Sequence, residues 1–467
     1  MTYRSFYRFF SILLHLIFNI ERNLSHKRNI LKMKFHTLAV IMLLSPFATA
    51  MAQSGTNSPY SQFGLGMLSD QSTGFNRGMN GVGVAFHEHN QVNSLNPASY
   101  SALDSLSFIF DVGLSGQISK FKENGVSKNA KNADFEYVVA GFRAFKHFGV
   151  SFGLLPFTNV GYSYSSSETL NDSRGTVSYN SFDGSGGLHE IYLGLGWSPF
   201  KGFSIGVNGA YLYGSMNRSI INSYSISSAN TISKYYTADV RSYKLDFGAQ
   251  YSFKVSKKDA VSLGAVYTPG HKIGGKPTLT MITSDTQSGV ADTTSYPGAG
   301  SPSLKFEIPT SLSVGLAYLH SNKLKVGVDY SLQKWADVDE PAYSLENGTP
   351  SYALRSGLFK DRHKVSAGLE YTPNQSSRHF VNRVRYRAGV SYATPYYYIN
   401  GQDGPKELSA SIGFGIPIMN SWNNRSILNI SGQWVRQSAK NFITDNTFRI
   451  NIGLTFNERW FAKWKVE

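Results

Sequence analysis

The sequence predicts an all-β protein, a 14-stranded antiparallel transmembrane β-barrel with an N-terminal hatch. Three observations predict it. From Asp104 onward, apolar residues alternate with small or polar ones, the period of two that separates the faces of a strand. Fourteen strand-length stretches show this pattern, and the links between them mostly alternate between short and long, as in outer-membrane barrels. The apolar face recurs on every strand, and nothing in the sequence covers it.

The composition excludes several other classes of protein. Charged residues make up 16% of the 467 residues, against the ~25% usual in soluble domains. Aromatic residues reach 14% and there are 44 glycines, so neither a disordered tail nor an ordinary cytosolic enzyme fits. The chain has no cysteine, which excludes disulfide scaffolds, thiol catalysis and thiolate metal sites.

The first residues predict export. Residues 33–52 combine a short basic start, an apolar run too short to span a bilayer and an Ala50-x-Ala52 cleavage site. We therefore expect a secretory signal peptide that is cut after Ala52. Residues 1–32 would then be an over-extended start, with Met33 the true initiator, and an amphipathic anchoring helix is the alternative for them.

The net charge depends on this cleavage. The full chain carries 45 basic and 30 acidic residues, or +15. Residues 1–52 hold seven basic residues and one acid, so the mature chain keeps 38 against 29, or +9. These charges are spread in ones and twos, without the clustered basic stripe that nucleic-acid binding needs. We expect no nucleic-acid partner.

Residues 53–103 predict a hatch that folds into the barrel. They are rich in Gly, Ser and Asn and show little strand periodicity, and their apolar residues would gain nothing in an exposed tail. The glycines of this stretch lack the spacing of a phosphate-binding loop. His87 and His89 flank Glu88, but no third ligand follows, so we expect no metal and no cofactor.

The barrel itself is predicted over residues 104–456, followed by a periplasmic C-terminal tail at 457–467. The short turns are assigned to the periplasm and the long links outside the cell. The last predicted strand ends on Phe456, which is typical of bacterial barrels. The predicted long links are residues 167–187, 217–236, 272–302 and 335–360.

A Gly-x-x-Tyr element recurs within the predicted strands. Positions three apart on a strand lie on opposite faces, so each tyrosine falls on the apolar face and each glycine on the other. Tyrosines near strand ends are typical of the aromatic girdle at a membrane interface, although a soluble sandwich would also use them in cross-strand packing. The six elements begin at Gly248, Gly264, Gly315, Gly327, Gly368 and Gly389.

Several charged side chains fall on the non-apolar face and predict a polar lumen. They are better read as a paired lining than as a catalytic acid and base, because nothing marks one of them as desolvated. No spacing indicates a Ser/His/Asp cluster, so we expect no enzyme. The predicted lumen lining is Lys325, Asp329, Glu370, Arg385 and Arg387.

Two motifs before the barrel carry a family resemblance. Gly81-Val-Gly-Val-Ala-Phe86, followed ten residues later by Asn96-Pro97-Ala98, resembles the FadL/TodX-type outer-membrane transport family in its Bacteroidetes-like version. The resemblance implies a plugged 14-stranded barrel that passes hydrophobic molecules by diffusion. It also implies that the Asn-Pro-Ala element packs inside the lumen and that Gly81, Gly83, Asn96, Pro97 and Ala98 take part in gating.

Two functions follow from this reading. The leading hypothesis is passive uptake of small hydrophobic molecules, of the long-chain fatty acid or aromatic hydrocarbon type, across the outer membrane of a Gram-negative bacterium. Its expected partners are outer-membrane lipid and the ligand itself. The alternative is a non-transporting barrel subunit of a larger outer-membrane assembly for secretion or biogenesis. Ligand docking at the outer rim, with plain girdle or loop packing as the alternative, is predicted for Trp335, Tyr396, Tyr397 and Tyr398.

Overall fold

The computed structural model describes residues 55–172, 174–298, 300–346, 348–418 and 426–459. The predicted over-extended start, signal peptide and most of the C-terminal tail lie outside these residues. None of the described helices is long and apolar enough to cross a membrane.

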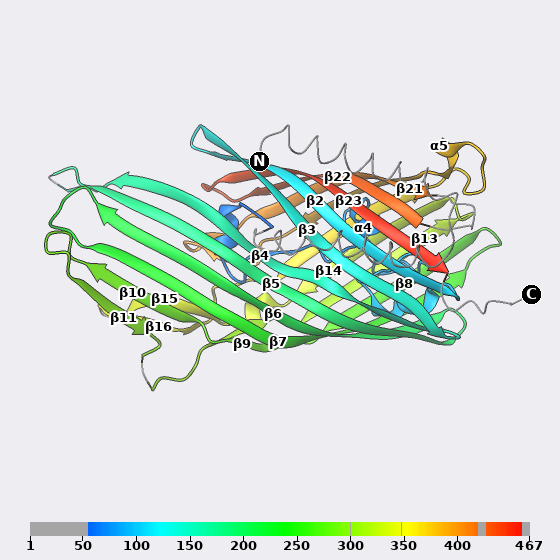
Figure 1. The fold of residues 1–467 in the computed structure, drawn as a ribbon, viewed down its shortest axis with the longest axis horizontal. Coiled ribbons are helices and arrows are strands. Elements are labelled where there is room, and N and C mark those ends of the chain that lie inside the picture. The colour runs from blue at the N-terminus through cyan, green and yellow to red at the C-terminus, as the bar shows by residue number, and fades with distance from the viewer. Residues whose placement is uncertain (1–54, 173, 299, 347, 419–425, 460–467) are drawn as a thin grey trace, which may run out of the picture. The chain divides into compact units, whose positions relative to one another are not determined.

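Within the described residues, fourteen antiparallel strands close into a barrel, which confirms the predicted fold class (Figure 1). Closure occurs where β23 (Thr444–Arg459) pairs with β2 (Ser107–Glu123). The strands between them, in chain order, are β3 (Val126–Phe145), β4 (Phe148–Thr169), β5 (Val177–Phe200), β6 (Phe203–Tyr224), β7 (Thr231–Lys254), β8 (Asp259–Thr268), β13 (Ser311–His320), β14 (Leu324–Gln333), β17 (Arg362–Tyr371), β18 (Arg385–Ala393), β21 (Lys406–Ile418) and β22 (Ser426–Ser438).

The other elements are short and lie before the barrel or in its links. Before the barrel come η1 (Pro59–Gln62), β1 (Met67–Leu68), α4 (Gly74–Arg77) and η2 (Pro97–Ala102). The links hold β9 (His271–Gly275), β10 (Thr278–Ser284), β11 (Ala291–Tyr296), β12 (Lys305–Ile308), η3 (Trp335–Asp337), β15 (Glu340–Glu346), β16 (Thr349–Arg355), α5 (Phe380–Arg383), β19 (Tyr398–Ile399) and β20 (Gln402–Asp403).

Two of the predicted long links, residues 167–187 and 217–236, are wrong as loops. Most of their residues extend β5, β6 and β7, and the β5–β6 pairing continues as far as Ser178 and Tyr224. These extensions carry polar residues on both faces, because a strand outside the bilayer needs no apolar face. Without that alternation the sequence gives no period-two signal, although the backbone pairs as in the membrane.

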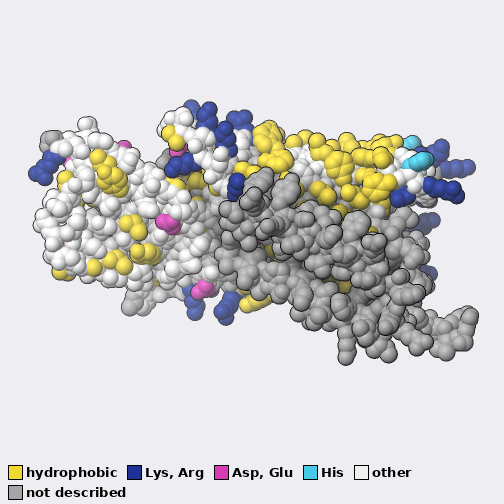
Figure 2. All heavy atoms as spheres, turned by 45° about the horizontal axis from the view of Figure 1, so that its top comes forward, with side chains coloured by type: hydrophobic (Ala, Val, Ile, Leu, Met, Phe, Trp, Pro, Cys, Tyr) yellow, Lys and Arg dark blue, Asp and Glu magenta, His cyan; other side chains and the backbone are white. Residues whose placement is uncertain are grey.

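The outward face of the barrel is apolar. Large side chains such as Leu195, Leu316 and Ile412 are exposed there, and hydrophobic side chains form a continuous band on the face shown in Figure 2. All six tyrosines of the Gly-x-x-Tyr elements are 37–46% exposed on this face. The outward apolar face and its tyrosines are therefore as the sequence predicts, and they are what a membrane barrel presents to lipid.

A charge placed in this band should be costly. Leu316 is half exposed near the middle of β13, so Leu316→Arg is expected to destabilise the folded barrel by about 2–4 kcal/mol. The measurement is the urea midpoint of unfolding in lipid vesicles. Ser313→Arg on the opposite face of the same strand is the control, and an equal loss in both variants would contradict a lipid-facing Leu316.

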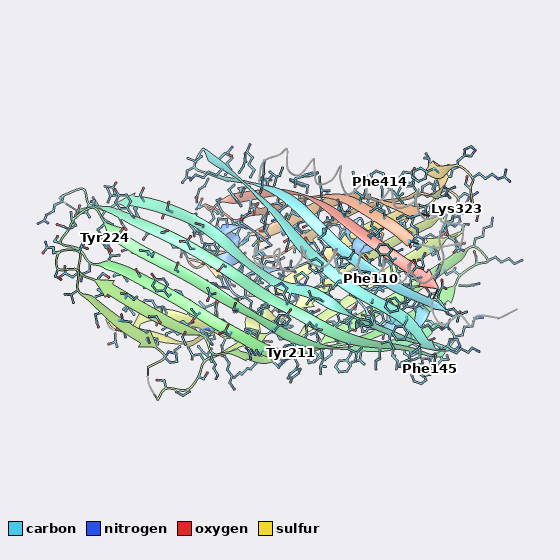
Figure 3. The ribbon with its side chains drawn as sticks, viewed as in Figure 1. Phe110, Phe145, Tyr211, Tyr224, Lys323 and Phe414 are labelled. Carbon is cyan, nitrogen blue, oxygen red and sulfur yellow. The ribbon has the colours of Figure 1, made fainter. Side chains whose placement is uncertain are left out.

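The two ends of the barrel differ in their links. Phe145 and Lys323 mark the end with short turns, and Tyr224 marks the opposite end (Figure 3). Because bacterial barrels carry short turns in the periplasm and longer loops outside, the end at Phe145 and Lys323 is the periplasmic one.

Residues 55–106, which we call the N-terminal segment, pack against the inner face of the barrel. Its buried side chains include Phe75, Met79 and Tyr100. The inward glycines of the Gly-x-x-Tyr elements lie against this segment. A methyl group added at Gly389 or Gly264 would overlap backbone atoms of the N-terminal segment, and one added at Gly248 or Gly327 would overlap its side chains. Glycine is therefore required on this face because the segment lies directly against the wall.

Candidate functional site

The barrel wall is interrupted between β3 and β4. Their pairing runs from Phe145–Phe148 only to Val138–Leu154. Beyond that point β3 continues along β2 and β4 continues along β5, so the two strands separate (Figure 1). We call this interruption the wall opening.

The N-terminal segment takes the place of β3 along the edge of β4. Met67 and Leu68 of β1 pair with Asn159 and Thr158. The Ser69 amide donates to the Phe157 carbonyl at 3.0 Å. Backbone groups of β4 that would otherwise be unsatisfied at an open edge are thus paired by the chain itself.

The same segment also reaches the other side of the wall opening. The Asn57 side chain donates to the Lys131 carbonyl of β3 at 3.3 Å. Ser61 bonds both the amide and the carbonyl of Gly161 on β4, at 3.1 and 3.2 Å. Residues 57–69 therefore contact both sides of the wall opening and fill it.

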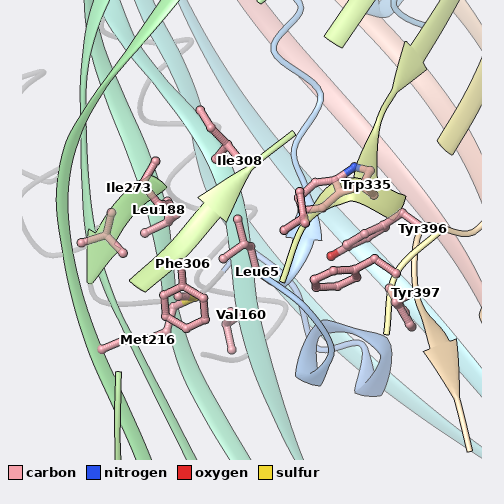
Figure 4. Close-up of a cluster of buried hydrophobic side chains, with 14 of the residues drawn as sticks. Leu65, Val160, Leu188, Met216, Ile273, Phe306, Ile308, Trp335, Tyr396 and Tyr397 are labelled. Atoms are coloured by element: carbon pink, nitrogen blue, oxygen red, sulfur yellow. The ribbon is translucent and has the colours of Figure 1, made fainter. Parts of the chain in front are cut away.

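An apolar cluster leads from the outer loops to the wall opening. At its centre lies Leu65 of the N-terminal segment, with Val160 of β4 on the wall side and Trp335 on the loop side (Figure 4). Phe63 and Leu68 pack against the same cluster. Its other buried members are Tyr60, Tyr162, Leu188, Leu212, Met216, Ala238, Val240, Ile273, Phe306, Ile308, Val338, Phe359, Tyr396, Tyr397 and Ile399.

Three of the four aromatic residues predicted at the outer rim meet in this cluster. Trp335, Tyr396 and Tyr397 are buried, and the first two rings lie 4.7 Å apart between centroids. The Tyr396 hydroxyl donates to the Gly66 carbonyl at 2.5 Å, and burial raises the pKa of Tyr396 well above its ordinary value, so it stays a donor. Tyr398 lies apart, 38% exposed. The three buried rings therefore cover the N-terminal segment.

One of the two glycines of the predicted gating motif, Gly83, is held by the lumen lining. Asp329 accepts hydrogen bonds from the amides of Gly83 and Val84 at 2.6 and 3.0 Å. Gly81 has a φ of +82°, a backbone conformation that favours glycine. One carboxylate of β14 therefore fixes two successive amides of the N-terminal segment.

The Asn-Pro-Ala element also lies against the inner face of the barrel wall. Asn96 caps η2 by accepting from the Ala98 amide at 3.0 Å, and it donates to the Val84 carbonyl at 2.8 Å. A methyl group added at Gly206 of β6 would overlap the backbone at Pro97 and Ala98. Asn96, Pro97 and Ala98 are thus held by backbone contacts with the wall.

The remaining predicted lining residues form one ion-pair network. Glu370 lies 2.7 Å from Arg387, 3.3 Å from Lys325 and 4.0 Å from Arg385. Lys325 also contacts Glu88 of the N-terminal segment at 2.6 Å. The lumen lining therefore binds the N-terminal segment through charge as well as through backbone contacts.

Sequence reasoning missed the pair that joins the segment to β3. Arg77 lies 2.9 Å from Glu136, and both side chains are buried. Arg77 also donates to the Asn451 side chain and to the Ser72 and Asp70 carbonyls. The sequence did point to this residue, because Arg77 is the only Lys or Arg among residues 53–103.

The His-Glu-His triplet does not converge. His87 bonds Gln250 at 2.7 Å, His89 bonds Asp104 at 2.9 Å and Glu88 pairs with Lys325. In the described part of the chain, no group of three metal-ligating side chains comes together.

One titratable group on the extracellular side, Glu340, is expected to make the stability of the β15–β16 hairpin depend on pH. Burial raises the pKa of Glu340 from 4.5 to about 7, and the charge of Arg218 opposes this. The carboxylate is disfavoured in the folded state, so the β15–β16 hairpin should dock most firmly below about pH 4.5, the ordinary pKa of this group. Stability should be lost as the pH rises to about 7, by at most about 3 kcal/mol.

Hydrogen exchange measures this effect in the hairpin. Between pH 5 and pH 8, protection of residues 349–355 should fall in the natural protein after correction for intrinsic rates. Glu340→Gln should keep the same protection at both pH values. Equal loss of protection in both proteins would contradict a role for Glu340.

A family model described as BamG matches residues 33–467. No curated protein matches the chain.

Solved structures share the barrel fold at low sequence identity. A Pseudomonas aeruginosa FadL homologue has a TM-score of 0.58 and 14% identity, over 84% of this chain and 99% of that chain. The Pseudomonas putida toluene transporter TodX has a TM-score of 0.56 and 15% identity, over 84% and 100%. The CymD monoaromatic hydrocarbon channel has a TM-score of 0.54 and 16% identity, over 86% and 100%. This fold and the outward apolar band together indicate the outer membrane of a Gram-negative bacterium.

Proposed function

The chain belongs to the BamG family, and on that premise we propose that it is an outer-membrane channel for passive uptake of small hydrophobic molecules, closed by its N-terminal segment. The ligand class is the long-chain fatty acid or aromatic hydrocarbon type. The resembling solved channels include proteins described as toluene and monoaromatic hydrocarbon channels. Their fold supports the proposal, and the more specific support comes from the residues of this chain.

The wall opening is the observation that carries the proposal. A sealed barrel offers a hydrophobic molecule only a polar lumen, whereas an interrupted wall offers a lateral path. The apolar cluster joins the outer loops at Trp335 to the edge of β4 at Val160. A ligand on this path keeps its apolar surface away from water, which favours its transfer by roughly 25 cal/mol per Å² without another energy source.

Residues 57–69 are the part of the segment that must move. They fill the wall opening through hydrogen bonds and through apolar contacts, and a ligand in the cluster would replace the apolar contacts with its own. Asn96, Pro97 and Ala98, the gating residues expected from the family resemblance, are held more tightly, because their backbone lies against glycines of the wall. We therefore assign the first movement to residues 57–69 and regard the Asn-Pro-Ala element as the fixed base.

Uptake by living cells tests the proposal. Cells that lack the protein are expected to take up labelled fatty acids or monoaromatic hydrocarbons more slowly than cells that carry it. The natural gene should restore the rate. Undiminished uptake across a broad panel of such compounds would contradict transport.

A second candidate is a non-transporting barrel subunit of a larger outer-membrane assembly. The density of contacts inside the barrel favours it: the close backbone approaches at Gly206 and Gly389 and the ion pair Arg77–Glu136 all resist opening. Purification in a mild detergent separates the two. Stoichiometric partner proteins would support the assembly subunit, and a lone barrel with bound apolar ligand would support uptake.

A further inference from the structure

The periplasmic turns are strongly basic. The described turns at this end lie between β3 and β4, β5 and β6, β7 and β8, β13 and β14, and β17 and β18. They carry seven lysine and arginine residues, distributed over all five turns. These residues are Lys146, Lys201, Lys257, Lys258, Lys323, Arg378 and Arg383, and Lys254 ends the strand before one of the turns.

Acidic residues do not balance this charge. The described residues of those five turns include no acid. Asp259, the first residue of β8, lies beside one of them, and its carboxylate already contacts His320 and the Tyr318 hydroxyl, each at 2.7 Å. Figure 2 shows the apolar band ending against Lys, Arg and His side chains. The positive charge therefore begins where the lipid-facing surface ends.

The turn between β17 and β18 is the longest of the five and has a defined structure. Arg383 donates to the Ser377 and Arg378 carbonyls at 3.0 and 3.1 Å. The Asn374 amide donates to the Asn382 carbonyl at 2.9 Å. These bonds fix α5 in place.

This fixed turn exposes two adjacent apolar side chains. Phe380 is 51% exposed and Val381 is 63% exposed. Arg378 and His379, which precede them, are also exposed. Apolar side chains beside cationic ones are typical of a segment that lies in a membrane interface.

The position of α5 is on the lipid side of the wall. The Tyr386 hydroxyl donates to the Val381 carbonyl at 3.0 Å, and Tyr386 packs edge-on against Phe414 of the outward apolar face. The neighbouring turn reaches the same place, since the Thr372 amide donates to the Lys323 carbonyl at 2.7 Å. Lys323 and Arg378 are both exposed there.

We propose that the periplasmic rim is a binding site for anionic phospholipid headgroups of the inner leaflet, with the α5 turn at its centre. Phe380 and Val381 insert below the headgroups, and Lys323 and Arg378 contact the phosphates. The attraction of such a leaflet is about 1 kcal/mol for each basic residue near the surface. A periplasmic protein would meet one sector of the rim, whereas the basic residues occupy every described turn, as a surrounding ring of lipid requires.

Native mass spectrometry of the full chain in mild detergent tests the proposal. The protein is titrated with phosphatidylglycerol or with phosphatidylcholine, and the retained lipid is counted. Phosphatidylglycerol should be retained more tightly. Lys323→Gln with Arg378→Gln should lower its affinity roughly thirtyfold, and Phe380→Ser with Val381→Ser should weaken retention of both lipids.

The matched control removes two charges from the opposite end. Lys128→Gln with Lys440→Gln, which are exposed extracellular residues, should leave retention unchanged. Heat-modifiable migration in gels confirms that each variant is a folded barrel. Equal retention of the two lipids, or unchanged retention after loss of Lys323 and Arg378, would overturn the proposal. So would loss of a stoichiometric acidic protein from those variants with lipid retention intact.

Discussion

Replacing Arg77 by alanine is expected to destabilise the folded barrel by about 3–5 kcal/mol. The substitution leaves Glu136 buried without its closest positive partner, which lies at 2.9 Å. It also removes the donors that bond Asn451 on β23 and the Ser72 carbonyl. The loss of stability should lie near the lower end of this range, because the Ser115 hydroxyl still donates to Glu136. The urea midpoint of the barrel in vesicles measures it.

A double variant separates buried charge from lost packing. Arg77→Met with Glu136→Gln keeps similar volume and leaves no unpaired charge, so it should recover much of the stability lost in Arg77→Ala. If the double variant is no more stable than Arg77→Ala, the ion pair is not what holds the N-terminal segment to β3.

A disulfide across the wall opening is expected to abolish uptake. Leu68 and Thr158 are opposite partners of an antiparallel pair, and such Cα atoms lie about 4.5–5.5 Å apart, within the range of a disulfide. Leu68→Cys with Thr158→Cys therefore joins the N-terminal segment to β4. The natural chain has no cysteine, so the introduced pair is the only thiol chemistry present.

A second disulfide controls for a general stiffening of the barrel. Ser313 of β13 and Ser331 of β14 are opposite partners whose hydroxyl oxygens lie 2.8 Å apart. Ser313→Cys with Ser331→Cys joins two wall strands without involving the N-terminal segment. Uptake should continue when this disulfide forms.

The barrel could be predicted from the sequence because its signals are local. Alternation along each strand and the Gly-x-x-Tyr spacing place Tyr318 outward and Gly315 inward without knowledge of any partner strand. The extracellular extensions, such as residues 177–187 of β5, gave no such signal. Water on both faces removes the demand for an apolar face, so the sequence there resembles a loop.

The candidate site could likewise be predicted only in part. Strand parity is enough to place Asp329 and Glu370 on the inner face, but it does not say what they bind. Asp329 binds the amide of Gly83, more than two hundred positions away. Glu370 pairs with Arg387 and Lys325, which lie on the strands to either side of its own. No local sequence pattern predicts the wall opening either. It depends on which neighbouring strand each of β3 and β4 stays paired with after the two separate at Val138 and Leu154.

Uptake by the Leu68→Cys with Thr158→Cys protein tests the central claim most directly. Labelled hydrophobic compound is followed into cells that carry this variant, before and after reduction of the disulfide. Cells with the oxidised protein should take up no more compound than cells lacking the protein, and reduction should restore the natural rate. Equal uptake in the oxidised and reduced states, with the disulfide verified, would show that hydrophobic molecules do not pass through the wall opening.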